Sequence, residues 1–569
     1  MLERLENFII LHAMMAYGKI SYKKYINKSK KANEINKKLL LKLIKKNRNT
    51  EFGKKYDFGS IKTITDYQKK VPYTTFSDYK DYVEKTVQTG KQNLITADKI
   101  CYFANTSGTM GNKKRIPIVN KTFNAYLNCA TIFIWNLKNE IKKRRKGIII
   151  GKGLNTIETE SEVMPGGIRA GFISGYALSS AKMFIPAITC LPKEVLGAGE
   201  QVDMKYIKAR YALEDRNLIY LMAVFMSTLT DLMKYIEDNH EMLINDIENG
   251  NINSSIKIPE DMKRRLERKL KPNKQRAEEL RKIFSTISKE PLIPLIWPKM
   301  SLIVAISTGE FSPFETKMRK YCGESIPFSY EMYASSEALI ATSLYPEDKN
   351  YMVLPDSGFY EFLPVDGEEK PLLMHELEVG KLYEIVVTNL AGLYRYRIKD
   401  VIRVTGFKGN LPLIQFAYRK EQLINMVGVH LTIESMTSAI KNFEKTIGVN
   451  ILDYSLYVDT DYVPNRVVLF IETEKDISNI KEINLSDLFD KSLSEVNEEY
   501  CRMLRIEEAS KSVVYTVKSG TYENYRMMKI KNGVPVNQIK TVRIIDKKEI
   551  LDYLMKSRES EYVIEGEKV

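Results

Sequence analysis

The sequence predicts an α/β protein, with a large first domain over residues 1–418 and a smaller α+β domain over 419–569. Its 569 residues suffice for two to four domains at roughly 100–200 residues per domain. Hydrophobic residues make up 44% and charged residues 28% of the chain, as in ordinary folded proteins, so wholesale disorder is excluded. From residue 302 onward, short apolar runs bounded by turns are interleaved with helical patterns, which indicates strands packed among helices.

The first half of the chain reads mainly as helices. Apolar residues recur at helical spacing near the N-terminus, where Leu39, Leu40, Leu43 and Ile44 share one face and lysines occupy the other. The expected helices cover residues 1–50, the stretch from the end of a polar turn at 104–117 through Trp135, residues 205–247 and the basic segment 261–287. A buried strand is expected over 146–153.

The second half reads as strands and short helices. The runs SLIVAIS, IPFSYEMYASS, YEFLPV and YEIVVTNL are each alternating or continuous in apolar residues and are bounded by turns. After the short charged stretch YRKEQ, which starts at Tyr418, we expect a hairpin over Leu452–Thr473, a helix near Leu485–Leu504 and further strands. The change of pattern at YRKEQ places the domain boundary there.

The charge and the cysteine content indicate which partners and which cellular compartment to expect for this protein. The 87 Lys and Arg exceed the 72 Asp and Glu, giving a net charge of +15, but lysines are spread along the chain rather than gathered in one arm. We therefore expect no nucleic-acid partner and no membrane partner. The five cysteines lack zinc-ligand spacing, the N-terminus does not resemble a secretory signal, and the apolar stretch 218–230 falls short of the ~20 residues that span a bilayer. These features predict a cytoplasmic protein with reduced thiols.

A hydroxyl-rich and glycine-rich turn is the first segment that can carry chemistry. It runs TSGTMGNKK from Thr106 to Lys114. Backbone N–H groups, hydroxyls and a lysine in such a turn can surround phosphate oxygens. The segment does not fit the P-loop pattern, and an ordinary polar hairpin turn is the alternative.

Two further segments place an aromatic ring and carboxylates at strand ends. In YASSE, the ring of Tyr333 could stack on a base and Glu337 could hold Mg²⁺ that bridges phosphates. In GLYRYRIKDV, Asp400 could accept hydrogen bonds from ribose hydroxyls. The alternatives are a satisfied strand-end acid at Glu337 and a cross-strand ion pair of Asp400 with Arg397 or Arg395.

Taken in order, these segments resemble the adenylate-forming superfamily, and most closely its acyl-acid amido synthetase branch, the family of the plant auxin- and jasmonate-conjugating enzymes. TSGTMGNKK is similar to the superfamily loop TSGTTGxPK, and AGLYRYRIKDVIRVTGF is similar to the branch motif AGLYRYRxGDVxxVTGF. Downstream, Tyr418-Arg419-Lys420 resembles the hinge, and NQIKTVR at 537–543 resembles the branch segment NQYKTPR. The resemblance covers roughly Tyr102 to Arg543.

The resemblance implies an ATP-dependent acid–amine ligase with ATP and Mg²⁺ at one site and a mobile C-terminal domain. It implies that a carboxylic acid is adenylated with release of pyrophosphate and passed to an amine, which we expect to be that of an amino acid, with release of AMP. By residue, it implies Lys540 at the α-phosphate; Ser107, Gly108, Thr109 and Lys114 at the other phosphates; Glu337 as catalytic residue and metal ligand; Tyr333, Ala334, Ser335 and Ser336 at the adenine; and Asp400 and Arg419 at the ribose.

Two departures from the family pattern bear on this transfer. Lys399 stands where the family has Gly, and its bulk, or a requirement for positive φ there, could perturb Asp400. Val542 replaces the family's Pro beside Lys540.

The identity of the acid and of the amine is not predicted, and two other functions stay open. Tyr206, Phe328 and Met332 are candidate residues for the acyl pocket, with a core position as the alternative for each. An acyl-coenzyme A ligase would share the first half-reaction, and a degenerate nucleotide-binding protein would share the fold. The motifs give no evidence on the oligomeric state, and we expect a monomer.

Overall fold

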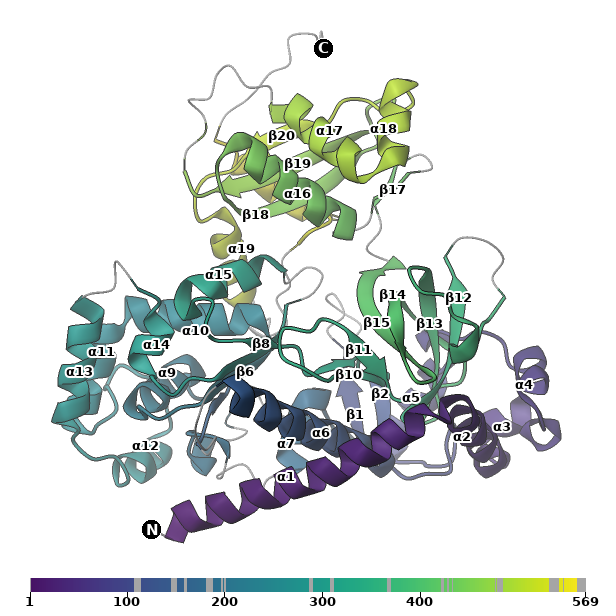
Figure 1. Cartoon of the computed structure of the whole chain (residues 1–569), viewed down its shortest axis with the longest axis horizontal. Coiled ribbons are helices and arrows are strands. Elements are labelled where there is room, and N and C mark those ends of the chain that lie inside the picture. The colour runs from purple at the N-terminus through teal and green to yellow at the C-terminus, as the bar shows by residue number, and fades with distance from the viewer. Residues whose placement is uncertain are drawn as a thin grey trace. The chain divides into compact units, whose positions relative to one another are not determined.

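The computed structural model describes most of the chain. The described residues are 2–106, 114–144, 151–157, 161–180, 188–195, 198, 201–285, 290–307, 312–365, 370–420, 424–426, 429–431, 433–475, 477, 485–531, 542–545 and 547–559. They form two compact units: one comprises residues 1–306 and 314–415, and the other comprises 307–313 and 416–569. Figure 1 shows the elements of each unit.

Both units contain helices as well as strands (Figure 1). The α-helices are α1 (Leu2–Ser29), α2 (Ala32–Asn47), α3 (Glu51–Lys55), α4 (Ile64–Lys70), α5 (Lys80–Thr89), α6 (Asn120–Arg144), α7 (Ile173–Ser180), α9 (Met204–Glu214), α10 (Met226–Asp238), α11 (His240–Asn249), α12 (Glu260–Glu267), α13 (Lys274–Ser285), α14 (Leu292–Ile296), α15 (Ser312–Cys322), α16 (Ile433–Ile447), α17 (Leu485–Val496), α18 (Glu498–Arg505), α19 (Thr521–Lys531) and α20 (Lys548–Lys556). Short 3₁₀ turns are η1 (Phe58–Ser60), η2 (Phe76–Asp78), η3 (Lys193–Val195) and η6 (Met374–Glu376).

Within the described ranges, the strands form five sheets. They are β1 (Ile100–Asn105), β2 (Arg115–Val119), β3 (Leu154–Asn155), β4 (Ser161–Val163), β5 (Arg169–Gly171), β6 (Tyr220–Phe225), β7 (Leu302–Ile306), β8 (Phe328–Ser329), β9 (Met332–Ala334), β10 (Leu339–Ser343), β11 (Tyr351–Val353), β12 (Gly358–Pro364), β13 (Leu382–Asn389), β14 (Tyr396–Lys408), β15 (Leu411–Arg419), β16 (Ile424–Met426), β17 (Val429–Leu431), β18 (Ile451–Asp459), β19 (Arg466–Thr473) and β20 (Val513–Thr516). The largest sheet has seven strands in the order β12-β13-β14-β15-β11-β10-β9.

The two four-stranded sheets differ in the relative direction of their strands. The sheet β3-β6-β7-β8 is parallel throughout, which is the arrangement that α/β units produce. The sheet β2-β1-β5-β4 contains the antiparallel hairpin of β1 and β2. In the second unit, β18 and β19 pair antiparallel, β20 joins in parallel, and α16 and α17 share the core beside them. The predicted α/β class is therefore confirmed.

The segment 205–247 was expected to be helical throughout, and this is wrong at one point. Residues Tyr220–Phe225 form β6, which lies between β3 and β7 in the parallel sheet. A short apolar run is compatible with a buried strand or a buried helix, and only its tertiary neighbours decide between them.

Two other predicted helices are interrupted. The basic segment 261–287 divides into α12 and α13 around Pro272, which cannot continue a helix because it lacks the backbone N–H. The helix near 485–504 divides at Asn497, whose side chain accepts a hydrogen bond from the Tyr500 N–H and caps α18. Most of the strand expected over 146–153 lies outside the described residues, which resume at Gly151 just before β3.

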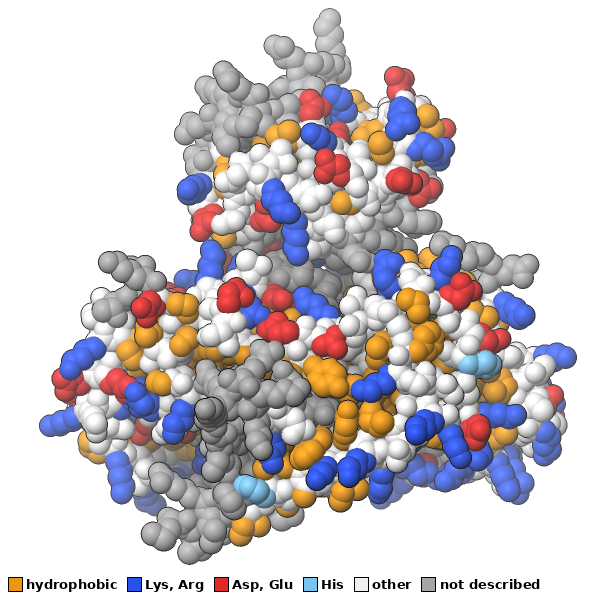
Figure 2. Space-filling model, viewed as in Figure 1, with side chains coloured by type: hydrophobic (Ala, Val, Ile, Leu, Met, Phe, Trp, Pro, Cys, Tyr) orange, Lys and Arg blue, Asp and Glu red, His pale blue; other side chains and the backbone are white. Residues whose placement is uncertain are grey.

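The distribution of charged side chains and the state of the cysteines match what the sequence predicts. Figure 2 shows Lys and Arg side chains scattered over the visible face, with Asp and Glu among them. All five cysteines are free. No helix among the described residues combines the length and the apolar character needed to cross a bilayer.

Candidate active site

The tyrosine of YASSE and the aspartate of the GLYRYRIKD segment are in direct contact. The Tyr333 hydroxyl on β9 donates a hydrogen bond of 2.9 Å to Oδ2 of Asp400 on β14. Three strands separate β9 from β14 in the sheet order, and neighbouring strands lie about 4.8 Å apart. The contact therefore requires the sheet to be strongly curved, so that residues far apart along it face one another.

A bulge in β14 directs Asp400 toward this contact. Glu384 pairs with Val401 and Val386 pairs with Arg397, so three residues of β14 oppose one residue of β13. Lys399, in the middle of the bulge, has φ +65°. Of the two possibilities raised for this position, bulk or positive φ, the backbone shows positive φ, a conformation that glycine adopts more readily than other residues.

Substitution of Lys399 separates the backbone effect from the side-chain effect. Lys399→Ala keeps a Cβ at positive φ, whereas Lys399→Gly removes it, and neither variant retains the ammonium group. We expect Lys399→Gly to have a free energy of unfolding about 1 kcal/mol higher than Lys399→Ala, because only glycine adopts this conformation without steric cost. Urea unfolding of both variants measures the difference, and equal stability would contradict a strained bulge.

The arginines of the GLYRYR segment have structural carboxylate partners. Arg395, which also has positive φ, lies against Glu361 with two hydrogen bonds of 3.0 Å, and both side chains are buried. Its Nη1 donates to the carbonyls of Gln68 and Val71 at 2.9 and 2.8 Å. Arg397 pairs with buried Glu384 at 2.7 Å. Both arginines thus have a partner other than Asp400, and Arg395 joins the N-terminal segment to the large sheet.

Asn389 holds two of the motifs together. Its Oδ1 accepts the N–H groups of Ala391 and Leu393 at 2.9 Å, while its Nδ2 donates to the Glu337 carbonyl at 2.7 Å. Sequence reasoning missed this residue. The available signal was an amide side chain at the end of a predicted strand, directly before the AGLYRYR turn.

The turn after β9 presents Glu337. The Ser335 N–H donates to the Ala338 carbonyl at 2.9 Å, and the Ala338 N–H donates to Ser335 Oγ at 3.2 Å, which closes a tight turn around Ser336 and Glu337. Ala334 is the last residue of β9. Among the described residues, no hydrogen bond or ion pair meets the Glu337 carboxylate, so it is available to a cation.

The residues present suit a phosphate-bound magnesium ion. The described part of the chain contains no group of three or more His, Cys, Asp or Glu side chains that could enclose a metal. Mg²⁺ is commonly held by one or two carboxylates together with substrate phosphates and water, rather than by a protein cage. A single open carboxylate at Glu337 fits that pattern.

The proposed phosphate loop joins β1 to β2. Asn105 pairs with Arg115, and the Thr106 N–H donates to the Lys114 carbonyl at 3.1 Å, so the hairpin closes at the base of the loop. The side-chain oxygens of Asn105 and Thr106 are buried there and have no hydrogen-bond partner among the described residues, and Lys114 is exposed. Ser107, Gly108 and Thr109 lie outside the described residues. Buried polar oxygens at the base of the loop suit hydrogen bonding to further polar groups.

The segment that carries Lys540 is anchored at its C-terminal end. Lys540 itself lies outside the described residues. Three positions later, buried Arg543 donates from Nη1 to Asp453 Oδ1 at 2.5 Å and to the Tyr454 carbonyl at 2.6 Å. Arg419 is the last residue of β15, where the chain enters the second unit.

Two of the three acyl-pocket candidates occupy the core. Tyr206 is fully buried, and its hydroxyl donates to Asp246 Oδ2 at 2.7 Å. Phe328 is also fully buried, with the Arg319 guanidinium 3.6 Å from the centre of its ring. Both agree with the core alternative. Met332 is half-buried on β9, next to Tyr333.

An unassigned acid, Glu331, lies between β8 and β9. Its φ is +37°, and its carbonyl accepts the Ser343 N–H at 2.9 Å. Burial raises the pKa of its carboxyl from the ordinary 4.5 to about 7. Among the described residues, no hydrogen bond or ion pair meets this carboxylate.

The raised pKa of Glu331 predicts a pH dependence of stability. The folded state favours the neutral acid, so the stability it contributes is fully present below pH 4.5 and is lost as the pH rises through about 7. Glu331→Gln stays neutral. We expect its melting temperature to rise relative to the unsubstituted protein between about pH 4.5 and pH 8, whereas exposed Glu260→Gln shows no such trend. If the melting temperatures of Glu331→Gln and the unsubstituted protein differed by the same amount at both pH values, the raised pKa would be contradicted.

Comparison with known structures identifies proteins that share this fold. The chain superimposes on an acyl acid amido synthetase, AtGH3.15 in complex with 2,4-DB, with a TM-score of 0.83 at 22% identity over 95% of this chain and 96% of that one. It also matches a 2-hydroxyisobutyryl-CoA ligase in its postadenylation state, with a TM-score of 0.53 at 10% identity over 92% of this chain and 90% of that one. The chain shares its overall fold with these two ligases.

Sequence comparison gives the family. Residues 21–328, 351–419 and 434–549 match the N-terminal, central and C-terminal domains of the GH3 family. The chain belongs to the GH3 family. It is 27% identical over 552 residues to the indole-3-acetic acid-amido synthetase GH3.4 of Arabidopsis thaliana, with 92% of this chain and 91% of that protein covered. It is 26% identical to the 4-substituted benzoates-glutamate ligase GH3.12 of the same plant, with 91% and 93% covered. The resemblance found in the motifs is therefore confirmed.

Proposed function

We propose that this protein is an ATP-dependent acyl-acid amido synthetase that joins a small carboxylic acid to an amino acid. Membership in the GH3 family and the names of its relatives support an AMP-forming acid–amino acid ligase. The single observation that carries the proposal within the structure is the contact between Tyr333 and Asp400. It brings a ring that can stack on adenine beside a carboxylate that can accept hydrogen bonds from ribose hydroxyls.

The reaction has two balanced steps. A carboxylate oxygen attacks the α-phosphorus of ATP, and the bond between that phosphorus and the bridging oxygen breaks, which releases pyrophosphate. The amine nitrogen then attacks the acyl carbon and loses a proton, and the acyl C–O bond breaks to release AMP. No covalent enzyme intermediate is needed.

The first step brings two anions together, so neutralisation of charge and alignment of the reactants are what the protein must supply. Lys540 stabilises the α-phosphate, and Lys114 and the turn that begins at Ser107 hold the other phosphates. Arg419 supports the ribose together with Asp400. Glu337 would hold Mg²⁺, which neutralises phosphate charge when bound. The C-terminal unit rotates between the two steps, in keeping with the hinge motif that follows Tyr418.

An acyl-coenzyme A ligase is the second candidate, and the CoA ligase that shares this fold is the observation in its favour. A non-catalytic nucleotide-binding protein is the third. Incubation with ATP, a panel of carboxylic acids and either mixed amino acids or coenzyme A separates all three by the mass of the product. We expect acyl–amino acid amides. Thioesters as the main product would favour the second candidate, and the absence of acid-dependent AMP the third.

Removal of the Tyr333 hydroxyl tests the nucleotide site. Tyr333→Phe keeps the ring but loses its hydrogen bond to the Asp400 carboxylate, and a hydrogen bond to a charged group is worth about 1.5–3 kcal/mol. We expect the KM for ATP to rise about 10-fold with little change in the KM for the acid. Tyr351→Phe is the matched control, because its hydroxyl donates to a backbone carbonyl instead. An unchanged KM for ATP would contradict the assignment.

We propose the cytoplasm as the compartment. Five free cysteines support it, because thiols persist in reducing compartments.

A further inference from the structure

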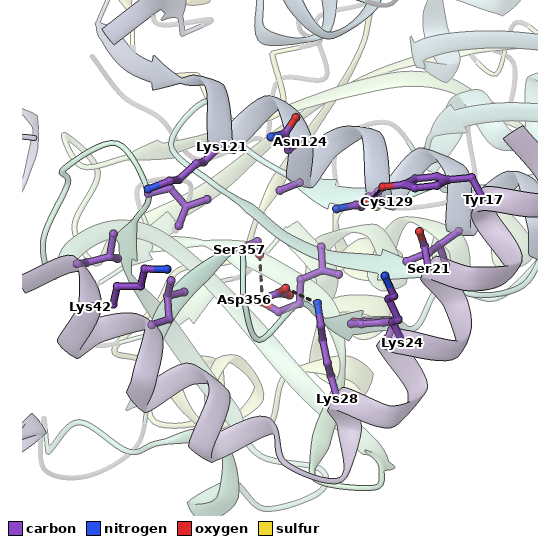
Figure 3. A pocket seen from close by; sticks show the side chains of 18 of the residues that line it. Tyr17, Ser21, Lys24, Lys28, Lys42, Lys121, Asn124, Cys129, Asp356 and Ser357 are labelled. Atoms are coloured by element: carbon purple, nitrogen blue, oxygen red, sulfur yellow. Dashed lines mark hydrogen bonds and ion pairs between the residues drawn. The ribbon is translucent and has the colours of Figure 1, made fainter. Parts of the chain in front are cut away.

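A pocket of about 440 Å³ opens between α1, α2 and α6, outside the candidate active site (Figure 3). None of its lining residues belongs to the loop after β1, to the YASSE turn or to the Asp400 bulge. Its volume lies in the range of pockets that hold small molecules.

Five lysines from three different helices surround the pocket. They are Lys24 and Lys28 on α1, Lys42 and Lys46 on α2, and Lys121 on α6. Figure 3 shows Lys42 and Lys121 on one side of the space and Lys24 and Lys28 on the other. All five side chains line the same hollow. Such a concave arrangement of like charges concentrates the positive potential.

Carboxylates neutralise only part of this charge. Asp356 is the one acidic residue in the lining, and it pairs with Lys28. Lys46 and Lys121 share a single carboxylate, that of Asp98, with Lys121 at 3.0 Å. Among the described residues, Lys24 and Lys42 have no hydrogen-bond or ion-pair partner. Five ammonium groups therefore face two carboxylates.

The wall between the lysines is apolar. Leu39 and Leu43 of α2, Ile132 of α6 and Leu390 after β13 line the pocket, and most of this surface is buried. On the α1 side, the Tyr17 hydroxyl is bound to Asn128 Oδ1 at 2.7 Å and the Tyr25 hydroxyl to the Val353 carbonyl at 2.6 Å. The polar groups of these two rings are thus already satisfied, and the rings offer apolar surface to a ligand.

We propose that this pocket binds a phosphate monoester with a short apolar tail. The excess of ammonium groups calls for more than one negative charge, and a phosphate monoester carries about −1.5 to −2 near neutral pH. Lysine ammonium groups bind phosphate as point charges, and the apolar wall accommodates an alkyl or aryl body. A carboxylate with the same tail carries only one charge, so it binds more weakly.

The test is calorimetric titration of the full chain with octyl phosphate, without ATP or acid. The pocket variant is Lys24→Ala with Lys42→Ala. The control is Lys23→Ala with Lys45→Ala, which removes the same charge from the same helices at exposed positions outside the pocket. We expect octyl phosphate to bind once per chain, about 10-fold more weakly to the pocket variant and unchanged to the control.

A further variant tests whether binding occurs in this pocket, and two further ligands test its specificity. Ala125→Phe on α6 fills the pocket without changing its charge, and we expect it to abolish binding while circular dichroism and adenylation activity are unchanged. Octanoate is expected to bind more weakly than octyl phosphate, and a non-hydrolysable ATP analogue is expected not to displace it. The proposal would be overturned if both lysine pair variants lost the same affinity for octyl phosphate, or if the ATP analogue displaced octyl phosphate. It would also be overturned if octanoate bound as tightly as octyl phosphate, or if octyl phosphate did not bind.

Discussion

Replacement of Lys540 with alanine is expected to slow acid-dependent pyrophosphate release by about 10²-fold or more. Adenylation brings a carboxylate against the α-phosphate of ATP as pyrophosphate leaves, and a lysine there offsets the negative charge that develops in the transition state. In a site that excludes water, one such charged contact contributes several kcal/mol. The loss should appear mainly in kcat, because the interaction strengthens in the transition state.

The matched control for this variant is Lys531→Ala, an exposed lysine at the end of α19 in the same unit. It removes the same charge from the same part of the chain. We expect it to retain the full rate. A Lys540→Ala protein with an unchanged rate of pyrophosphate release would show that another group stabilises the α-phosphate.

Replacement of Arg395 with methionine is expected to lower the free energy of unfolding by about 3–5 kcal/mol. The change leaves the Glu361 carboxylate in the core without its cation, and it removes two hydrogen bonds to the carbonyls of Gln68 and Val71. The loss of a buried charge's partner lowers the free energy of unfolding far more than a surface ion pair raises it.

Tryptophan fluorescence reports this effect in the first unit alone. The chain has two tryptophans, Trp135 and Trp297, and both lie in that unit. The double variant Arg395→Met with Glu361→Gln removes the uncompensated charge, so it should recover much of the stability that Arg395→Met loses. Loss of less than about 1 kcal/mol in the single variant, or no recovery in the double, would contradict a structural role for the pair.

The parts of the fold with strong local signals were predictable. Periodicity gave the N-terminal helices, and alternation gave the strands around Phe359 and Val386 and the hairpin of β18 and β19. The strand Tyr220–Phe225 was not predictable, because a short apolar run acquires its conformation from neighbouring strands. The break at Pro272 was available in the sequence, since proline cannot continue a helix.

The candidate site was predictable as a set of motifs but not as a geometry. The family glycine at the position of Lys399 suggested either a lack of space or positive φ there, and the backbone has positive φ. The contact between Tyr333 and Asp400 depends on the curvature of a sheet in which three strands lie between them, and no local pattern encodes that curvature. The burial of Tyr206 and Phe328 likewise depends on distant packing partners, which composition cannot reveal.

Isotope transfer tests the central claim, that the acid is activated as an adenylate. The protein is incubated with ATP, an amino acid and a carboxylic acid whose two carboxylate oxygens are oxygen-18, and the AMP is analysed by mass spectrometry. Attack of the carboxylate on the α-phosphorus, followed by cleavage of the acyl C–O bond, leaves one labelled oxygen on AMP. We expect label in AMP and none in pyrophosphate. Unlabelled AMP, or ADP with labelled inorganic phosphate, would contradict the account.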